Sequence, residues 1–270
     1  MVCVMATYAH FFIALAPILS AVACDDPPKP APTKPSATVP AVAPALASAA
    51  QNDDKPKEVK KAKPKKTAAD CPKGPKVAFD DQAVEDEVRK KLGKEGGDVT
   101  QADLGKLKSL NLSQIKMDEL DVCVIPHAKN LKELFIGPGE TDDLAPIAGL
   151  TQLESLRASI NKVADLRPLE KLTKLDRLDL GRTQVTDLGP LSALGSLTEL
   201  AVDDTPVRDL SPLAKLEKLQ RLSIQRTQVK DFGPLKDLNN LKFLYIAGTP
   251  ATDTSMLQPL RAKGLKIFDQ

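Results

Sequence analysis

The chain has 270 residues, and its 38 Lys and Arg against 36 Asp and Glu give a formal net charge of +2. It has two histidines and no tryptophan, and only His127 lies beyond the first 24 residues. One histidine argues against a histidine metal cluster and against a Ser-His-Asp triad, so we expect neither an enzyme nor a bound cofactor or metal.

The first 24 residues contain no Asp, Glu, Lys or Arg. Within them, the apolar run FFIALAPILSAVA (11–23) ends in small residues directly before Cys24. Its length fits the core of a signal peptide and is short for a membrane span. Ala21-Val22-Ala23-Cys24 resembles a bacterial lipobox, which implies cleavage before Cys24 and lipidation of that cysteine. We therefore interpret 1–23 as a signal peptide, with an uncleaved membrane anchor as the alternative.

Residues 24–76 read as a disordered linker that begins at the lipidated cysteine. The stretch 25–76 holds 11 of the 22 prolines, no aromatic residue, 11 lysines and 6 acidic residues. Such a composition buries too little apolar surface to offset the entropy of ordering the chain. Its lysine run KKAKPKK (60–66) is either a solvated tether or a weak contact to anionic lipid or cell-wall polymer. Nucleic acid is not expected as a partner, because the run has no interleaved aromatic residues and the chain is exported.

Residues 77–106 are predicted to form a small helical cap. Four apolar residues recur at helical spacing: Phe79, Val84, Val88 and Leu92. Asp80 or Asp81 is placed to cap the start of that helix, and Gly96-Gly97 should end it. Thr100 and Asp103 provide a second start signal. Solenoid proteins need such atypical ends to cover the exposed core of the first repeat.

Two cysteines, Cys71 and Cys123, lie on either side of this cap. An even number of cysteines in a chain bound for an oxidising space favours a disulfide between them. The alternative is two independent thiols, with Cys123 buried as a small apolar side chain. A thiolate–imidazole pair of Cys123 with His127, four residues away, is the less favoured interpretation.

From residue 107 to residue 270 the sequence repeats every 22 residues. The stretches RTQVTDLGPLSAL (182–194) and RTQVKDFGPLKDL (226–238) lie 44 residues apart, or two periods. The first position of the unit is leucine in six successive units: Leu131, Leu153, Leu175, Leu197, Leu219 and Leu241. The generic unit is LxxLxLxxTxVxDLxPLxxLxx, and self-similarity at a fixed period indicates a repeat architecture.

The spacing within the unit predicts its local structure. LxLx alternates apolar and polar residues, as a strand with one buried face does. DLxPLxxL has a proline and apolar residues three apart, which favours a 3-10 turn. The aspartate at position 13 is placed to accept an otherwise unpaired backbone N–H at the start of that turn. Stacked units would line their strands into a parallel sheet over one continuous core.

The unit resembles a leucine-rich repeat of the 22-residue type found in bacterial internalins, over residues 104–265. The resemblance implies an α/β leucine-rich repeat solenoid with a parallel sheet on its concave face and 3-10 turns and loops on its convex face. The family places asparagine at position 9, where its amide bonds the backbone of the next coil. Here Asn161 is followed by threonines, whose hydroxyls make fewer such bonds.

In that fold the concave face is built from positions 3, 5, 7 and 8 of each unit. Twelve residues there are candidates to contact a partner: Phe135, Arg157, Arg177, Asp179, Arg182, Glu199, Asp203, Asp204, Arg221, Arg226, Phe243 and Tyr245. Two columns alternate in charge, Arg177–Glu199–Arg221 and Arg182–Asp204–Arg226, and cross-strand ion pairs explain them at least as well as binding does.

Phe243 and Tyr245 place two of the few aromatic side chains on one solvent-facing strand. Aromatic side chains commonly anchor protein interfaces, and Arg221 on the neighbouring strand is within reach of a cation–π contact with Phe243. The competing interpretation is that both rings shield the open C-terminal end of the solenoid. Beyond them, Leu265-Lys266-Ile267 reads as one last half-coil.

We interpret the chain as an exported, lipid-anchored leucine-rich repeat protein of the bacterial cell envelope. The expected role is interaction with an unidentified protein on the concave face, or scaffolding, by a monomer held at the membrane through its lipid. The alternative is a structural envelope protein whose basic linker contacts cell-wall polymer or anionic lipid.

Overall fold

The computed structural model describes residues 65–270. The expected signal peptide, the lipidation site Cys24 and the linker up to residue 64 lie outside the described residues. Within residues 65–270, no helix combines the length and the apolar character needed to cross a bilayer.

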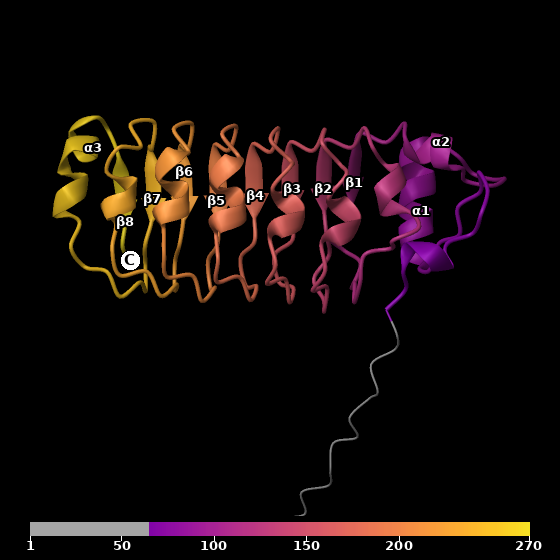
Figure 1. Ribbon diagram of the computed structural model, residues 1–270, viewed down its shortest axis with the longest axis horizontal. Coiled ribbons are helices and arrows are strands. Elements are labelled where there is room, and N and C mark those ends of the chain that lie inside the picture. The colour runs from indigo at the N-terminus through magenta and orange to yellow at the C-terminus, as the bar shows by residue number, and fades with distance from the viewer. Residues whose placement is uncertain (1–64) are drawn as a thin grey trace, which may run out of the picture. The chain divides into compact units, whose positions relative to one another are not determined.

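Eight short parallel strands form one sheet, and they follow one another in chain order (Figure 1). The strands are β1 Ser109–Asn111, β2 Glu133–Phe135, β3 Ser155–Arg157, β4 Arg177–Asp179, β5 Glu199–Ala201, β6 Arg221–Ser223, β7 Phe243–Tyr245 and β8 Lys266–Phe268. From β2 to β7, each residue pairs with the residue 22 positions later, as Leu134 does with Leu156. The predicted period is thus the register of the sheet, and the predicted leucine-rich repeat solenoid is confirmed.

Each coil returns through a 3-10 helix on the side of the core opposite the sheet. These helices are η2 Ile125–His127, η3 Ala145–Ile147, η4 Arg167–Leu169, η5 Gly189–Ala193, η6 Ser211–Lys215, η7 Gly233–Leu235 and η8 Ser255–Leu257. The position-13 aspartates accept the first helical N–H in six units, at 2.7 to 2.9 Å. The predicted turn type and its aspartate cap are both present.

The leucines of the repeat form a single core between the sheet and the 3-10 helices. Leu153, Leu175 and Leu197 are fully buried, as is Phe232, the largest side chain in the core. Fully burying such a side chain contributes roughly 1.5–3 kcal/mol, so the stacked repeats supply most of the driving force for folding. Each coil depends on its neighbours, because one unit alone would leave these side chains exposed.

Position 9 departs from the predicted bonding in one respect. The Asn161 side chain is buried, and its Nδ2 donates to Gly137 O at 3.0 Å, so the amide bonds the preceding coil and not the next one. Thr183 and Thr205 each donate one hydroxyl bond to a carbonyl of their own coil, Leu180 O at 2.7 Å and Val202 O at 2.6 Å. The threonine hydroxyls at this position bond within their own coil, so they stiffen single coils without linking them.

The cap contains two helices, α1 Gln82–Leu92 and α2 Gln101–Leu104. Asp81 caps α1 by accepting from Ala83 N at 2.7 Å, and Thr100 with Asp103 forms a capping box at α2. The helix α1 ends at Gly93 with φ 63°, earlier than the predicted Gly96-Gly97, because a left-handed glycine already satisfies its last carbonyls. Val84 and Val88 are buried and join the core.

The segment 65–76 packs against the cap, although the predicted linker extends to residue 76. Gln101 N donates to Pro75 O at 2.9 Å, and Cys71 is joined to Cys123 with their Cα atoms 5.4 Å apart. Lys65 pairs with Asp142 at 2.6 Å. These contacts hold the last residues of the predicted linker on the domain. Sequence composition does not predict these contacts, because a disulfide and ion pairs can form in a segment without apolar residues.

The C-terminal end consists of α3 Gln258–Ala262 and the strand β8. The strand pairs with β7 at an offset of 23 residues, as in Leu244 with Ile267, because the last unit carries one extra residue before Gly264. The predicted half-coil is therefore a full strand of the sheet.

Candidate functional site

Two rows of side chains cover the exposed face of the sheet, which we call the sheet face. The first row is Ser109, Glu133, Ser155, Arg177, Glu199, Arg221, Phe243 and Lys266. The second row is Asn111, Phe135, Arg157, Asp179, Ala201, Ser223, Tyr245 and Phe268. Both rows face away from the core because side chains alternate across a strand, and the middle residue of each strand points inward.

An open groove of about 340 Å³ runs over the sheet face from β2 to β6. Six of the predicted site residues line it: Phe135, Arg157, Arg177, Asp179, Glu199 and Arg221. The repeat brings these residues together because it places the same two positions of each unit on the same face. The other six candidates lie outside the groove, at one edge of the sheet or toward its C-terminal end.

Charges inside the groove pair in a pattern that differs from the predicted column. Arg157 Nε lies 3.0 Å from Asp179 Oδ2, and Arg177 is 4.0 Å from Glu133 and 3.9 Å from Asp176. Glu199 lies in register between two arginines, yet it forms no ion pair with any residue of the described chain. The predicted Arg177–Glu199–Arg221 pairing is therefore wrong, since Arg177 turns to other carboxylates and Arg221 turns to aromatic rings.

The second predicted column does form ion pairs, at the edge of the sheet face. Asp204 accepts from Arg226 Nη2 at 2.7 Å and lies 3.5 Å from Arg182 Nε. The hydrogen bond from Arg226 holds the pKa of Asp204 below its usual value, and Asp204 raises the pKa of Arg226. This column is structural in character, because its two arginines and its carboxylate satisfy one another.

The same column has an unusual backbone conformation. Ile160, Arg182, Asp204 and Arg226 have φ between 52° and 61°, in the left-handed region, and Gly248 occupies the equivalent position with φ 72°. A β-branched residue in this region is strained. The sequence carries no sign of this turn, because glycine appears at the position only in the last full unit.

One carboxylate oxygen of Asp203 is engaged in the fold. Its Oδ1 accepts from Ser223 Oγ and from Gln225 N, both at 2.7 Å. These bonds tie the coil of β5 to the coil of β6. Asp203 therefore has a structural role, and a partner would have to bind its Oδ2.

Aromatic side chains gather at the C-terminal end of the sheet face. Arg221 Cζ lies 5.0 Å from the ring centroid of Phe243 and 5.9 Å from that of Tyr245. Arg221 Nη1 also contacts the Tyr245 hydroxyl at 3.2 Å. Tyr245 stacks on Phe268 with ring centroids 4.6 Å apart. The cation–π contact that the sequence suggested between Arg221 and Phe243 is present in the structure.

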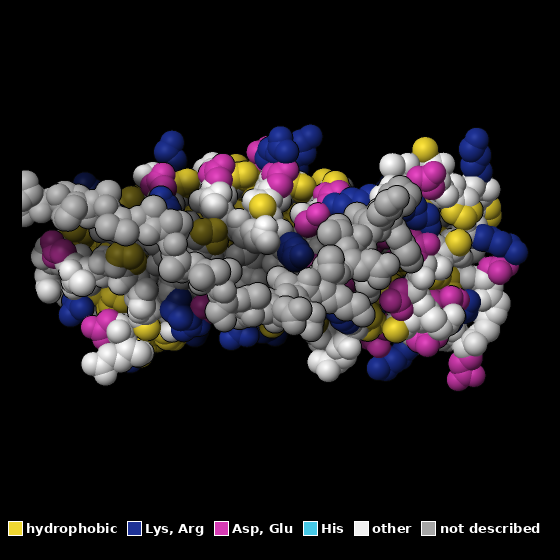
Figure 2. Space-filling model, turned by 90° about the horizontal axis from the view of Figure 1, so that it is seen from below, with side chains coloured by type: hydrophobic (Ala, Val, Ile, Leu, Met, Phe, Trp, Pro, Cys, Tyr) yellow, Lys and Arg dark blue, Asp and Glu magenta, His cyan; other side chains and the backbone are white. Residues whose placement is uncertain are grey.

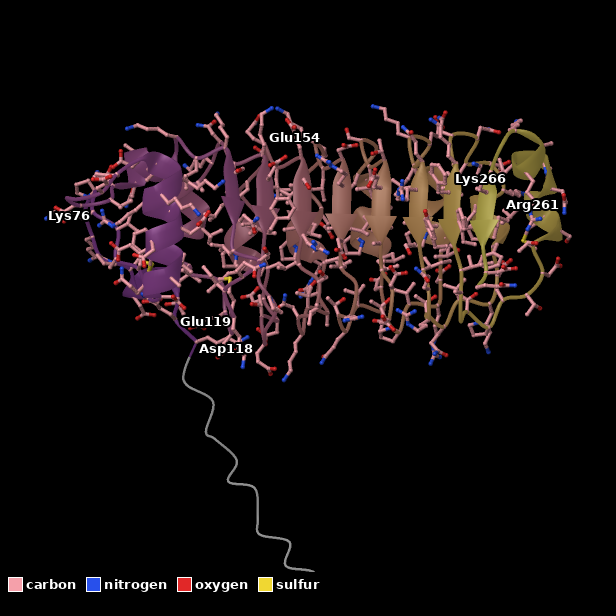
Figure 3. The ribbon with its side chains drawn as sticks, turned by 180° about the vertical axis from the view of Figure 1, so that it is seen from behind. Lys76, Asp118, Glu119, Glu154, Arg261 and Lys266 are labelled. Carbon is pink, nitrogen blue, oxygen red and sulfur yellow. A yellow bond between two sulfur atoms is a disulfide. The ribbon has the colours of Figure 1, made fainter. Side chains whose placement is uncertain are left out.

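Sequence reasoning missed Phe268 and Lys266 as members of the sheet face. Their side chains are exposed, Phe268 by 39 %. The sequence does contain a signal for them, which is the extra residue in the last unit. That residue places the last strand 23 residues after the preceding one, where a 22-residue period would not place it. Figure 3 shows Lys266 on β8, at the end of the sheet opposite α1.

The described part of the chain contains both residues of the one candidate thiol–imidazole pair, Cys123 and His127. Residues 65–270 contain no group of three or more His, Cys, Asp or Glu side chains placed to hold a metal ion. Cys123 is bonded to Cys71, so it does not form a thiolate pair with His127. Where side chains are visible in the view from below, Lys and Arg lie among Asp and Glu (Figure 2).

Comparison with known proteins places the chain among leucine-rich repeat structures. A model for leucine-rich repeats in two copies matches residues 151–193. The mouse leucine-rich repeat and WD repeat-containing protein 1 is 34% identical over 79 residues, which are 28% of this chain and 12% of that protein.

Two crystal structures from Listeria monocytogenes resemble the whole solenoid. Internalin InlF has a TM-score of 0.65 and 28% identity, and the match covers 70% of this chain and 56% of that one. Internalin C2 has a TM-score of 0.60 and 27% identity, covering 71% of this chain and 94% of that one. The chain thus spans about an eighth of the mouse relative and little more than half of InlF. Its fold is a leucine-rich repeat solenoid similar to that of these internalins.

Proposed function

We propose that this chain is an exported, lipid-anchored protein of the bacterial cell envelope that binds another protein through its sheet face. Leucine-rich repeat domains of the internalin type typically serve as protein-interaction modules and not as enzymes. The observation that carries the proposal is the groove on the sheet face, which continues into an aromatic cluster at β6, β7 and β8. Flat, half-buried aromatic side chains beside arginine are the usual anchors of a protein interface.

The envelope location and the lipid rest on the sequence alone. The support for them is the lipobox-like Ala21-Val22-Ala23-Cys24 and the apolar run before it. On this proposal wild-type protein partitions with membranes and starts at a modified Cys24, whereas Cys24→Ala is released or unprocessed. An unmodified N-terminus at Met1 or Met5 in wild-type protein would remove the lipid from the account.

The alternative, in which the basic linker contacts wall polymer or anionic lipid, has fewer cations available than the sequence suggests. Lys65 pairs with Asp142 and Lys66 with Asp80, each at 2.6 Å. Each lysine donates a hydrogen bond to its carboxylate, and this bond raises the pKa of both lysines. Two cations of the lysine run are therefore occupied by the domain itself.

The proposal is tested by changing the aromatic pair Phe243 and Tyr245 to serine together. A protein captured from envelope extract by the wild-type chain should lose about 2 kcal/mol of binding free energy, which is the size expected for interface hot spots. Lys215→Ser with Lys236→Ser, two exposed positions at the 3-10 helices, is the control and should leave binding unchanged. A double variant that melts markedly lower and still binds the partner would show that the two rings serve only as an end cap.

A further inference from the structure

Two cations on the sheet face have no carboxylate partner within the described chain. The other arginines of the sheet face and its edge are paired: Arg157 with Asp179, Arg177 with Glu133, and Arg182 and Arg226 with Asp204. Arg221 and Lys266 form no such pair, and both side chains are exposed. They lie in the same row, on either side of Phe243.

The aromatic rings leave the charge of Arg221 available to a ligand. Its guanidinium lies over Phe243 and Tyr245, and only Nη1 is engaged, by the Tyr245 hydroxyl at 3.2 Å. A guanidinium has five N–H donors, so the remaining donors can bind a carboxylate in a bidentate manner. Stacking on a ring also fixes the side chain in place, which lowers the entropy lost when a ligand binds.

The distance between the two cations sets the spacing of complementary groups. Arg221 and Lys266 are two strands apart, and strands lie about 4.8 Å from one another, so their Cα atoms are about 10 Å apart. An extended peptide rises about 3.3 Å per residue and its side chains alternate in direction, so side chains that face the sheet together are an even number of residues apart. Side chains four residues apart are separated by about 13 Å, a distance that the long side chains of Arg221 and Lys266 can span. Between the two cations a ligand meets Phe243, with Tyr245 and Phe268 alongside in the second row.

Resting on the proposed function, we propose that the C-terminal third of the sheet face binds an acidic segment of the partner protein. The segment is extended across the strands, with two carboxylates four residues apart and an apolar side chain midway between them. The carboxylates pair with Arg221 and Lys266, and the apolar side chain lies on Phe243. The groove reaches β6 and therefore continues into this site, where the rest of the segment extends.

The test uses the full chain carrying Tyr8→Phe, in which Tyr245 is the one remaining tyrosine and its fluorescence reports the site. The probe is the peptide acetyl-Gly-Asp-Ser-Phe-Ser-Glu-Gly-amide, in which Asp, Phe and Glu face the same side, and its neutral counterpart has Asn and Gln in place of Asp and Glu. We expect the acidic peptide to bind at least about tenfold more tightly than the neutral one, the size of one charged hydrogen bond. Added salt should reduce this preference, because the site is exposed to solvent.

Two matched double variants each remove two positive charges, one from the sheet face and one from the opposite side of the core. Arg221→Gln with Lys266→Gln should abolish the preference for the acidic peptide. Lys215→Gln with Lys236→Gln, on the opposite side of the core, should leave it unchanged. Lys266→Gln alone changes one exposed side chain and should reduce the preference in part, so the inference can still be tested if the double variant fails to fold.

Three outcomes would overturn the inference. One is equal binding of the acidic and neutral peptides, and another is an acidic preference that survives Arg221→Gln with Lys266→Gln. The third is polyphosphate of matched charge competing as well as the acidic peptide, which would make the site a general anion site. None of these results bears on whether a partner contacts the remainder of the sheet face, so the proposed function stands or fails separately.

Discussion

At the scale of single residues, position 8 of the repeat has a strained backbone conformation that the sequence does not predict. The turns after β3, β4, β5 and β6 have a left-handed backbone at this position, where the chain uses Ile160, Arg182, Asp204 and Arg226. Asp204 tolerates this conformation because its short polar side chain bonds locally, whereas Ile160 is β-branched and has no such compensation. Ile160 is also 49 % exposed, so core packing does not explain it.

We predict that Ile160→Gly stabilises the protein by about 1 kcal/mol, because relief of backbone strain outweighs the added freedom of the unfolded chain. Gly248→Ala should have the opposite sign, since its φ is 72° and a Cβ there would lie 2.9 Å from Arg226 Cγ. Urea unfolding of the two variants measures both effects. A lower midpoint for Ile160→Gly would show that the isoleucine side chain makes a contact worth more than the strain.

The Asp204 carboxylate links the stability of the solenoid to pH. The hydrogen bond from Arg226 lowers its pKa in the folded state, so folding favours the ionised form. Its stabilising contribution is therefore complete above the usual aspartate pKa of about 3.9. It disappears as pH falls through the lower pKa that Asp204 has in the folded state. Asp204→Asn keeps the shape and tolerates the left-handed turn, so we expect the variant to lose less stability than wild type between about pH 5 and pH 3. Equal losses in thermal scans would mean that Asp204 is not ion-paired in solution.

At the scale of elements, the sequence predicts strands, turns and caps well because each depends on residues within one unit. The aspartate at position 13 and the Thr100–Asp103 box are local signals, and both appear as expected. Contacts between coils are harder to predict because each side chain has several partners within reach. Arg221 lies opposite Glu199 in register, yet it turns to the rings of the next strand. A single extra residue before Gly264 changes the repeat length to 23, so a 22-residue period does not place Phe268 on the sheet face.

The link between the segment 65–76 and the first coil rests on the Cys71–Cys123 bridge, which spans 52 residues. We predict that neither cysteine is alkylated in the native protein until a reductant is added. Closing a loop of that length stabilises by roughly 4 kcal/mol on the chain-entropy model, so reduction or Cys71→Ser should lower the melting temperature. Mass spectrometry of the peptides that contain Cys71 and Cys123 measures their alkylation, with denatured, reduced protein as the control. Ready labelling of both thiols in native, unreduced protein would contradict the bridge.

At the scale of the whole molecule, the repeat explains why the fold was predictable and the partner was not. Core positions recur in every unit. Leu134 and its equivalents in the next five units therefore all predict a strand of the sheet. Residues on the sheet face differ from unit to unit, and only their positions, not their pairing, follow from the period. The groove and the aromatic cluster at β6 to β8 emerge once the strands are placed side by side.

The central claim is that the sheet face, and not the 3-10 side, contacts a protein. The most direct measurement places a photo-crosslinking amino acid at Arg177 or Glu199 on the sheet face, and at Lys171 or Lys215 on the opposite side. All four side chains are exposed, so the probes differ in location and not in accessibility. In cells we expect the two sheet-face positions to yield the same protein adduct and the other two to yield none. Adducts from Lys171 and Lys215 alone, or the same adduct at equal yield from all four positions, would contradict the claim.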